Sequence, residues 1–358
     1  MKGDNPMEGV TFASPRSVVR DDNAPMRYDE VGFVDWQRRR YGFGLPLWVA
    51  LGGAGSGCES NFDPVVVAAH GWVGYESLFL ARSLGFLAHQ QGMLLSTKTA
   101  AESLAALRSG QAHAAGLALD EALIAHHDGL DLGIVLVMDV SLGADVVLAR
   151  SGIETLSALK GLRLGLESSS VADILAHEML HVAGLKRDQV QWVRLPVQRH
   201  IQAWQDGMVD ALITYEPTAS TLQSLGARRL FDTRSMPNTI VDVLVVRNDL
   251  LNSARQSAVR QLVRAHFQAL NHLLYNPQDA AYRMAPRLHL KASQVLVALR
   301  GLFLPDLQAN RRMLRLQEPV LLDAAKRVNQ AMQAMGQTLA AERVADMLRP
   351  QFVNEVTV

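Results

Sequence analysis

The sequence has little cysteine, no net charge and no long apolar run. Its single cysteine among 358 residues excludes an internal disulfide and a zinc site built from cysteines. Thirty-five Lys and Arg balance 35 Asp and Glu, so no overall field favours nucleic acid or an anionic membrane surface. The chain is nevertheless 49% hydrophobic and long enough for two domains of ordinary size. We therefore expect a globular protein with a large core and no nucleic-acid partner.

The apolar stretch near the N-terminus has the layout of a secretory leader. Arg38–Arg40 precede the apolar residues 41–54, and small residues follow up to Cys58. A basic region, a short apolar region and small residues before a cleavage point describe a signal peptide. The stretch is too short and too rich in glycine for a transmembrane helix. We therefore expect residues 38–57 to be a leader that directs the chain out of the cytoplasm.

Cys58 stands where a bacterial lipoprotein carries its lipid-modified cysteine. The likeness to a lipobox is incomplete, because that pattern places Leu three residues before the cysteine and Gly55 stands there. We expect lipid attachment at Cys58, with plain secretion or a retained anchor as alternatives. A cysteine buried in a core helix fits poorly, since four of the residues 52–57 are glycine and would destabilise that helix.

The first 37 residues differ in character from the rest. They are polar, contain Pro6, Pro15 and Pro25, and show no sustained apolar period. A signal peptide begins near its basic residues, so residues 1–37 are expected to be disordered or to precede the true start. We place that start between Met26 and Arg38.

From Pro64 onward, short apolar runs alternate with helical patterns, which is typical of βαβ units and a mostly parallel sheet. The predicted strands are Val65–Ala69, Gly92–Ser96, Ala114–Leu119, Leu132–Met138, Val146–Ala149, Arg163–Leu166, Val190–Arg194, Ala211–Thr214 and Val241–Val246. The predicted helices between them include Thr99–Arg108, Val171–Val182 and His200–Gln205. Beyond Asn252 the pattern is helical throughout.

Two segments of the chain resemble each other. Residues 103–121 and 200–217 each follow the order helix, glycine turn, strand and acidic loop. Two similar α/β lobes explain this likeness, and chance similarity between two ordinary units is the alternative.

Two such lobes would be joined by two crossings, at residues 139–150 and 238–247. This predicts a first lobe over 58–150, a second over 151–237, and a return to the first lobe over 238–350. Two crossings form a hinge, and a ligand bound between the lobes can then close them.

The turn after the first predicted strand contains Trp72 and Tyr75 and leads into a helix that begins near Glu76. This turn is a candidate binding site, because ligands bind beyond the carboxyl ends of the strands in an open α/β sheet. Trp72 and Tyr75 could stack on a planar ligand, although Trp72 could also cover the core of its lobe. Glu76 either contacts the ligand or only favours the positive end of the helix dipole, an effect of about 0.3–1 kcal/mol.

Further carboxylates occupy strand ends or lobe crossings, namely Asp139, Asp145, Glu216 and Asp242. If three or more carboxylates face the cleft, an anionic ligand is disfavoured. Gathering like charges in a low-dielectric pocket costs free energy, on the order of several kcal/mol. An amine, an amidine or an aminopyrimidine would suit them.

Three serines, Ser168, Ser169 and Ser170, follow one strand and begin the helix Val171–Val182. Hydroxyls and free N–H groups at a helix start bind carboxylates, sulfonates or phosphates, and they also serve as ordinary N-caps. We expect at least one of the three to contact the ligand. Together with the carboxylates, this predicts a ligand with an acidic or polar end and a cationic or aromatic part.

A zinc site is the competing interpretation of the helix 171–182. His177, Glu178 and His181 spell His-Glu-x-x-His, a metalloprotease pattern. The apolar face of this helix is the one it would bury, and no third ligand follows at a recognised spacing. We therefore predict no metal and no cofactor.

Several stretches, in this order and spacing, resemble the extracytoplasmic substrate-binding proteins of ABC importers, in the nitrate/sulfonate/taurine and thiamine-pyrimidine-precursor group. The stretches are residues 72–76, 80–82, 139–145, 159–161, 167–170, 207–211, 215–217 and 242–246. The resemblance spans about residues 64–250. It implies a two-lobed periplasmic-binding-protein fold of the second type, in which each lobe is a mostly parallel sheet flanked by helices and two crossover strands form the hinge.

The resemblance also places the ligand at the lobe interface. The expected ligand-binding residues are Trp72, Tyr75, Glu76, Asp139, Ser141, Asp145, Ser168, Ser169, Ser170, Tyr215, Glu216 and Asp242.

The leading hypothesis is a non-enzymatic, monomeric solute receptor that delivers a small molecule to an ABC permease from the periplasmic side, anchored to the membrane by lipid. A first rival is an enzyme on the same fold, similar to pyrimidine-precursor synthases. That enzyme would need a reactive His or Lys in the cleft and should be cytosolic, so the export signal argues against it. A second rival is a ligand-sensing adaptor for a membrane receptor.

Overall fold

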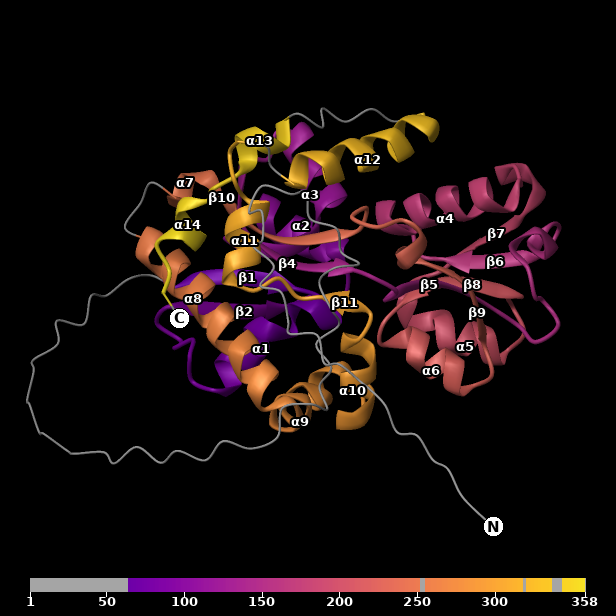
Figure 1. Ribbon diagram of the computed structural model, residues 1–358, viewed down its shortest axis with the longest axis horizontal. Helices are drawn as coiled ribbons and strands as arrows, with labels where there is room; N and C mark the ends of the chain where they lie inside the picture. The colour runs from indigo at the N-terminus through magenta and orange to yellow at the C-terminus, as the bar shows by residue number, and fades with distance from the viewer. Residues whose placement is uncertain (1–63, 252–254, 318–319, 337–342, 358) are drawn as a thin grey trace, which may run out of the picture. The chain divides into compact units, whose positions relative to one another are not determined.

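The computed structural model describes residues 64–251, 255–317, 320–336 and 343–357 (Figure 1). Within these residues the strands form two sheets, with the orders β11-β4-β10-β3-β1-β2 and β7-β6-β8-β5-β9. The strands are β1 Val65–Ala69, β2 Gly92–Ser96, β3 Ala114–Ala118, β4 Leu132–Ser141, β5 Asp145–Ala149, β6 Arg163–Leu166, β7 Gln191–Arg194, β8 Ala211–Tyr215, β9 Arg228–Asp232, β10 Val241–Arg247 and β11 Leu302–Phe303.

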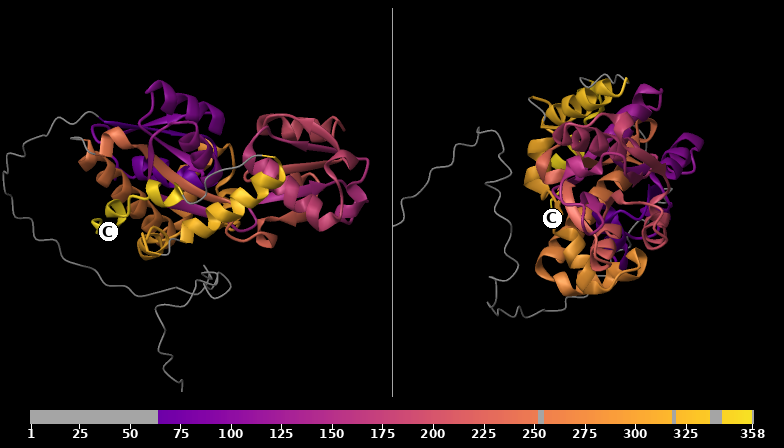
Figure 2. Two further views of the ribbon diagram at one scale, coloured as in Figure 1. Left: turned by 90° about the horizontal axis from the view of Figure 1, so that it is seen from above. Right: turned by 90° about the vertical axis from the view of Figure 1, so that its right-hand side faces the viewer.

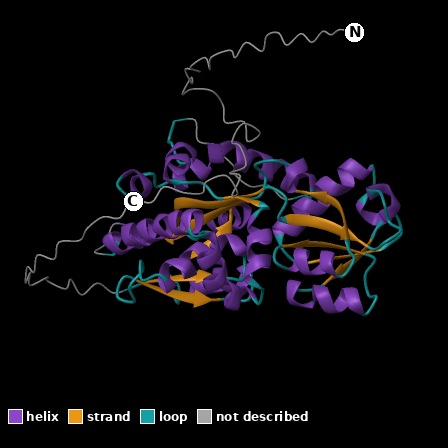
Figure 3. Cartoon of the chain, turned by 60° about the horizontal axis from the view of Figure 1, so that its bottom comes forward, coloured by secondary structure: helices purple, strands orange, loops and turns teal. Residues whose placement is uncertain are grey.

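Helices cover both sheets (Figure 3). They are α1 Glu76–Ser83, α2 Ala100–Ser109, α3 Leu119–His127, α4 Ser170–Ala183, α5 His200–Gln205, α6 Thr218–Ser224, α7 Asn248–Leu251, α8 Gln256–Tyr275, α9 Pro277–Leu288, α10 Ala292–Leu299, α11 Leu307–Met313, α12 Val320–Ala334, α13 Val344–Met347 and α14 Gln351–Asn354. None of the described helices is long and apolar enough to cross a membrane.

The six-stranded sheet and its helices form the first lobe, and the five-stranded sheet forms the second. The first lobe combines the beginning of the described chain with its end, and the second lobe is built from the middle (Figure 2). The predicted two-lobed α/β fold is therefore confirmed. The predicted strands are all present, and β4 continues past Met138 to Ser141. The charged strand β9 and the two-residue strand β11 were not predicted.

The sheets are mixed rather than mostly parallel, which corrects the prediction. Strand β1 is parallel to β2 and β3, and β6 is parallel to β7 and β8. In contrast, β10 is antiparallel to β3 and β4, and β5 is antiparallel to β8 and β9. The antiparallel pairs arise because the strand that enters each lobe at the hinge, β10 or β5, runs against the strands on both of its sides.

The two sheets repeat one arrangement. The order β2-β1-β3-β10-β4 in the first lobe corresponds to β7-β6-β8-β5-β9 in the second, with the same parallel and antiparallel pairs. The similar segments 103–121 and 200–217 supply β3 and β8, which occupy equivalent positions. The likeness within the sequence thus marks equivalent parts of two lobes.

The chain crosses between the lobes at two places. The first crossing joins Ser141 of β4 to Asp145 of β5, and the second joins Asp232 of β9 to Val241 of β10. The first comes earlier than the predicted boundary at Arg150, because β5 already pairs with β8 and β9.

The core explains why these segments fold as they do. All ten residues of β4 are buried, and one apolar cluster runs from the first lobe to the α4 face of the second sheet. A second cluster, around Trp204 and Leu212, covers the opposite face of the second sheet. Each fully buried Leu or Val contributes roughly 1.5–3 kcal/mol relative to an exposed one. Helix α12 packs against both α3 and α4, so it contacts both lobes.

Candidate functional site

A cavity of about 440 Å³, counted to its open mouth, lies between the two lobes. The first lobe lines it with His70, Trp72, Tyr75, Ala100, Ala118, Glu121, Ile240 and Asp242, and the second with Asp145, Glu167, Ser169, Val171 and Tyr215. Most of the polar members follow the carboxyl end of a strand, where the sheet stops and a turn begins.

The turn after β1 brings its aromatic side chains into the cavity wall. Trp72 has an extended backbone, and the short helix Val73–Tyr75 then leads into α1. A Cβ at Gly74 would lie 1.8 Å from Asp139 Oδ2, and one at Gly116 would lie 3.0 Å from the Tyr75 ring. Only glycine leaves room at position 74, and a side chain at position 116 would press on the Tyr75 ring.

Hydrogen bonds to carboxyl groups hold both aromatic side chains. Trp72 Nε1 donates to Asp139 Oδ2 at 3.1 Å, and the Tyr75 hydroxyl donates to Asp242 Oδ1. The Trp72 ring also meets Tyr215 of the second lobe edge to face, with centroids 5.6 Å apart. The two hydrogen bonds therefore fix Trp72 and Tyr75 within the first lobe, and Trp72 also contacts the second lobe through Tyr215.

Asp139 and Asp242 face each other on neighbouring strands. They are partners in the register of β4 and β10, and their side chains are hydrogen bonded. Burial, together with the charge of Asp242, raises the pKa of Asp139 well above its usual range. Burial also raises the pKa of Asp242 to about 7. Two carboxyl groups can share a hydrogen bond only when one of them carries a proton.

Three other carboxyl groups line the cavity. Asp145 has one oxygen, Oδ2, with no partner among the described residues, and burial raises the pKa of Asp145 to about 7. Glu121 accepts from the backbone N–H of Ala118 at 3.0 Å, while burial raises the pKa of Glu121 well above its usual range. Glu167 accepts from the Tyr215 hydroxyl at 3.3 Å, and burial raises its pKa too.

No Lys or Arg occurs among the described residues that line the cavity. Of the described lining side chains, only His70 could become cationic, and burial lowers its pKa to about 4. Within the described part of the chain, the lining carboxyl groups therefore lack a cationic partner in the cavity. Such a site attracts a cation or several hydrogen-bond donors.

Half of the twelve predicted residues line the cavity: Trp72, Tyr75, Asp145, Ser169, Tyr215 and Asp242. Ser169 is also the N-cap of α4, because its hydroxyl accepts from Ala172 N at 3.3 Å. Among the others, Asp139 lies behind Asp242, Ser168 is exposed, and the Ser170 hydroxyl bonds to the carboxylate of Asp120.

Glu76 does not line the cavity, and this corrects the prediction. Its side chain is fully buried and forms an ion pair with Arg287 of α9. The same guanidinium donates to the carbonyls of Ala69 and His70, and it stacks 3.5 Å from the centroid of the Phe79 ring. Burial raises the pKa of Glu76 to about 7, although the charge of Arg287 acts to lower it. Arg287 thus joins α9 to the end of β1 and, through Glu76, to the start of α1.

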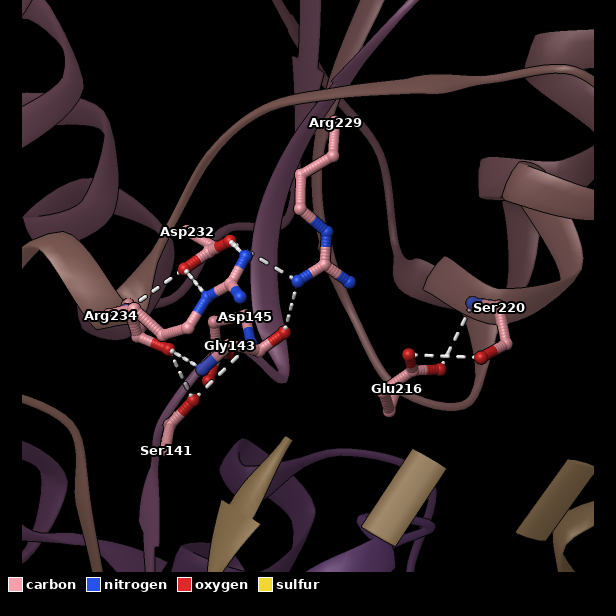
Figure 4. A network of polar contacts seen from close by, with 9 residues as sticks. Ser141, Gly143, Asp145, Glu216, Ser220, Arg229, Asp232 and Arg234 are labelled. Carbon is pink, nitrogen blue, oxygen red and sulfur yellow. Dashed lines mark hydrogen bonds and ion pairs between the residues drawn. The ribbon is translucent and has the colours of Figure 1, made fainter. Parts of the chain in front are cut away.

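Ser141 and Glu216 also have structural partners instead of facing the cavity (Figure 4). The Ser141 hydroxyl bonds to Thr233 Oγ1 at 2.7 Å, and Thr233 Oγ1 also accepts from Gly143 N at 2.7 Å, which ties the two crossings together. The Glu216 carboxylate accepts from the backbone N–H and the hydroxyl of Ser220 at 3.0 Å each, at the start of α6.

Three polar residues of the cavity were missed from sequence, namely His70, Glu121 and Glu167. Each has the signal that selected the others, since each lies just beyond a predicted strand. Glu121 ends the repeated segment 103–121, and Glu167 adjoins the three serines. Cys58 and the predicted leader lie outside the described residues. His177 and His181 are on α4, and no group of three metal-ligating side chains occurs among the described residues.

The fold and the cleft define a two-lobed binding-protein architecture. Residues 75–280 match the family model described as NMT1/THI5 like, and the chain belongs to this family. The family match bears out the resemblance predicted from the sequence.

A curated relative matches part of the chain at low identity. "Putative binding protein BAB2_1146" of Brucella abortus (strain 2308) is 23% identical over 145 residues, which are 38% of this chain and 44% of that protein. The match thus spans less than half of the relative's length.

Solved structures match over more of the chain. The periplasmic aliphatic sulphonate binding protein SsuA from Escherichia coli has a TM-score of 0.66 at 17% identity, over 82% of this chain and 99% of that one. The zinc-bound ligand binding component of an ABC-type import system from Staphylococcus aureus has a TM-score of 0.68 at 14% identity, over 83% of this chain and 99% of that one. The desulfurization enzyme DSZB has a TM-score of 0.62 at 18% identity, over 82% of this chain and 98% of that one. At these identities the likeness establishes the fold.

Proposed function

We propose that this protein binds a small cationic solute, with an aromatic or polar part, between its lobes and delivers it to an ABC permease without changing it. One observation carries the choice of solute. Carboxyl groups from both lobes, including Glu121, Asp145, Glu167 and Asp242, line the cavity, and no Lys or Arg is among the described lining residues.

The charge of the cavity separates this protein from a receptor for nitrate or sulfonate. An anion would add a negative charge to a buried group of carboxyls, which would have to hold protons to accept it. A protonated amine, amidine or aminopyrimidine would instead supply the missing positive charge and several N–H donors.

The aromatic walls suit the same solute. Trp72 and Tyr215 meet at the lobe interface, and a cation over a tryptophan face gains about 0.5–2 kcal/mol, depending on how far it is desolvated. A planar, charged nitrogen heterocycle would use both the rings and the carboxyls.

Electrostatics can also couple binding to closure. Glu121 and Asp242 belong to the first lobe, while Asp145 and Glu167 belong to the second. Without a cation, the lobes can approach only if most of these carboxyls hold protons, because ionised carboxyls on both sides would repel each other. A bound cation contacts carboxyls of both lobes at once when the lobes are closed. It therefore binds the closed state more tightly and shifts the equilibrium toward that state.

A ligand screen tests this proposal. Purified protein is heated with amines, amidines and aminopyrimidines, and in parallel with nitrate and alkanesulfonates. A ligand at 100 times its dissociation constant raises the free energy of unfolding by about 2.7 kcal/mol. Stabilisation by a member of the cationic set, followed by calorimetric titration, supports the proposal. Stabilisation by the anions alone contradicts it.

The enzyme alternative rests on one observation. His70 lines the cavity, its Nδ1 has no partner among the described residues, and its lowered pKa keeps it neutral. A neutral imidazole is the form that acts as a base or nucleophile. Mass spectrometry of a bound solute after long incubation separates the two functions, since a receptor returns it unchanged.

Location and partners complete the proposal. We infer export by the leader 38–57, lipid attachment at Cys58, and a monomer that meets its permease outside the cytoplasm. Radioactive palmitate labelling of the wild-type chain, lost in Cys58→Ala, tests the anchor. Co-purification with a permease, as opposed to a receptor kinase or cyclase, separates transport from the sensing alternative.

A further inference from the structure

The two acidic residues at the back of the cavity differ in their access to a solute. Asp242 lines the cavity, whereas Asp139 is fully buried behind it on the neighbouring strand. The register of β4 and β10 places the two side chains opposite each other. Only Asp242 can therefore meet a solute directly.

The hydrogen bonds of the pair require a proton. Trp72 Nε1 donates to Asp139 Oδ2, and Tyr75 donates to Asp242 Oδ1. Asp139 Oδ1 has no donor among the described residues, yet the two carboxyl groups are hydrogen bonded to each other. Asp139 is fully buried whereas Asp242 faces the cavity, so the shared proton belongs to Asp139, whose ionised form is the more disfavoured by burial. The direction in which this contact shifts each pKa agrees with this placement.

We propose that Asp139 is a positioning residue whose protonated carboxyl group joins Trp72 to Asp242. It accepts the indole N–H with one oxygen and donates its proton to Asp242 with the other. It thereby fixes an aromatic wall and keeps the cavity-facing carboxylate charged and oriented. The binding consequence rests on the proposed function, because Asp242 is where a cationic solute would be held.

The surroundings keep the proton in place. The titratable groups that face the pair come from the turn before α1, from α3 and from β5, and they are Tyr75, Asp120, Glu121 and Asp145. All of them are acids, so a second ionised carboxyl among them would be strongly disfavoured. The space around the Asp139 side chain is also restricted, because only a glycine at position 74 leaves room beside Asp139 Oδ2.

Two variants separate a positioning role from simple packing. Asp139→Asn has the same shape, and its amide can donate to Asp242 and accept from Trp72. Asp139→Leu has a similar volume and can do neither. The indole N–H of Trp72, assigned with Trp72→Phe, is followed by NMR without any ligand. We expect slow solvent exchange in wild type and Asp139→Asn, and at least about tenfold faster exchange in Asp139→Leu, since an N–H without its partner is less protected.

Infrared spectroscopy locates the proton. Other buried carboxyl groups also absorb in this region, so the spectrum of Asp139→Asn at neutral pH is subtracted from that of wild type. The difference should show the carbonyl band of one protonated carboxyl group. Asp242→Asn is the matched control, and it should leave Asp139 free to ionise. Absence of the difference band between wild type and Asp139→Asn would overturn the proposal.

Affinity for a cationic ligand found in the screen completes the test. We expect Asp139→Asn to stay within about threefold of wild type and Asp139→Leu to bind at least about tenfold more weakly, a difference of about 1.4 kcal/mol. Equal losses in the two variants would contradict the positioning role while the proposed function stands. If no cation binds wild type but the NMR and infrared results hold, the proposed function fails and the structural role of Asp139 stands.

Discussion

The indole N–H of Trp72 donates a 3.1 Å hydrogen bond to Asp139, a residue 67 positions later in the chain. This contact connects the turn after β1 to the strand that leads into the hinge. It explains why the aromatic wall of the cavity and the acidic group behind it form one unit. Changes on either side should therefore alter both ligand affinity and local order.

Replacing Asp145 by Asn should weaken binding of a cationic ligand and stabilise the empty protein. Loss of a charge-assisted hydrogen bond costs about 1.5–3 kcal/mol, which is about 10- to 150-fold in dissociation constant. The empty protein should gain stability because Asn carries no ionisable group into this buried site. Calorimetric titration and urea unfolding measure the two effects. Asp188→Asn, the same change at an exposed site, is the control. Unchanged affinity in Asp145→Asn would remove this residue from the site.

The stability of the empty protein should fall with rising pH because of the cavity carboxyls. The pKa values of Asp145 and Asp242 are about 7 in the folded state, above their ordinary value of 3.8. The folded state thus binds more protons than the unfolded state between these values. The stability contributed by each group is fully present below about pH 4 and is lost as pH rises to about 7, by up to about 1.4 kcal/mol per pH unit.

The double variant with Asn at positions 145 and 242 isolates this contribution. Its urea unfolding free energy, compared with wild type from pH 4 to pH 8, should fall less steeply over that range. Parallel curves for the two proteins would show that these groups titrate alike in the folded and unfolded states.

Replacing Arg287 by Gln should destabilise the fold by about 3–5 kcal/mol, because it leaves the carboxylate of Glu76 buried without its partner. Adding Glu76→Gln should recover much of that loss, since the second change removes the unpaired charge. Neither change should alter ligand affinity in the protein that remains folded. Thermal unfolding of the two single variants and the double variant gives the coupling. A large affinity loss in Glu76→Gln alone would return this residue to the binding site.

Replacing Glu216 by Ala should affect stability but not binding. Its carboxylate accepts from Ser220 at the start of α6, and loss of such a cap costs about 0.5–2 kcal/mol. Trp72→Ala is the matched comparison, because this side chain lines the cavity and its loss should weaken ligand binding. Titration of both variants checks the contrast. It would be contradicted if Glu216→Ala lost affinity as strongly as Trp72→Ala.

The hydrophobic pattern was enough to predict nine of the eleven strands in the described residues and the division into two lobes. Val65–Ala69 and Val241–Val246 are short, β-branched runs whose burial follows from local composition. The likeness of residues 103–121 and 200–217 predicted repeated lobes, and both supply equivalent strands. The charged strand Arg228–Asp232 escaped notice, because it lies beside the buried strand β5 and has little apolar pattern of its own.

The sequence by itself determined which acids and aromatics follow the strands. Only the tertiary structure decided which of them meet a solute. Arg287 lies 211 residues from Glu76 and neutralises it, and Thr233 lies 92 residues from Ser141 and bonds to its hydroxyl. Local pattern can place a side chain at the end of a strand. The direction in which that side chain points depends on long-range partners, because a buried polar group turns toward whatever can satisfy it.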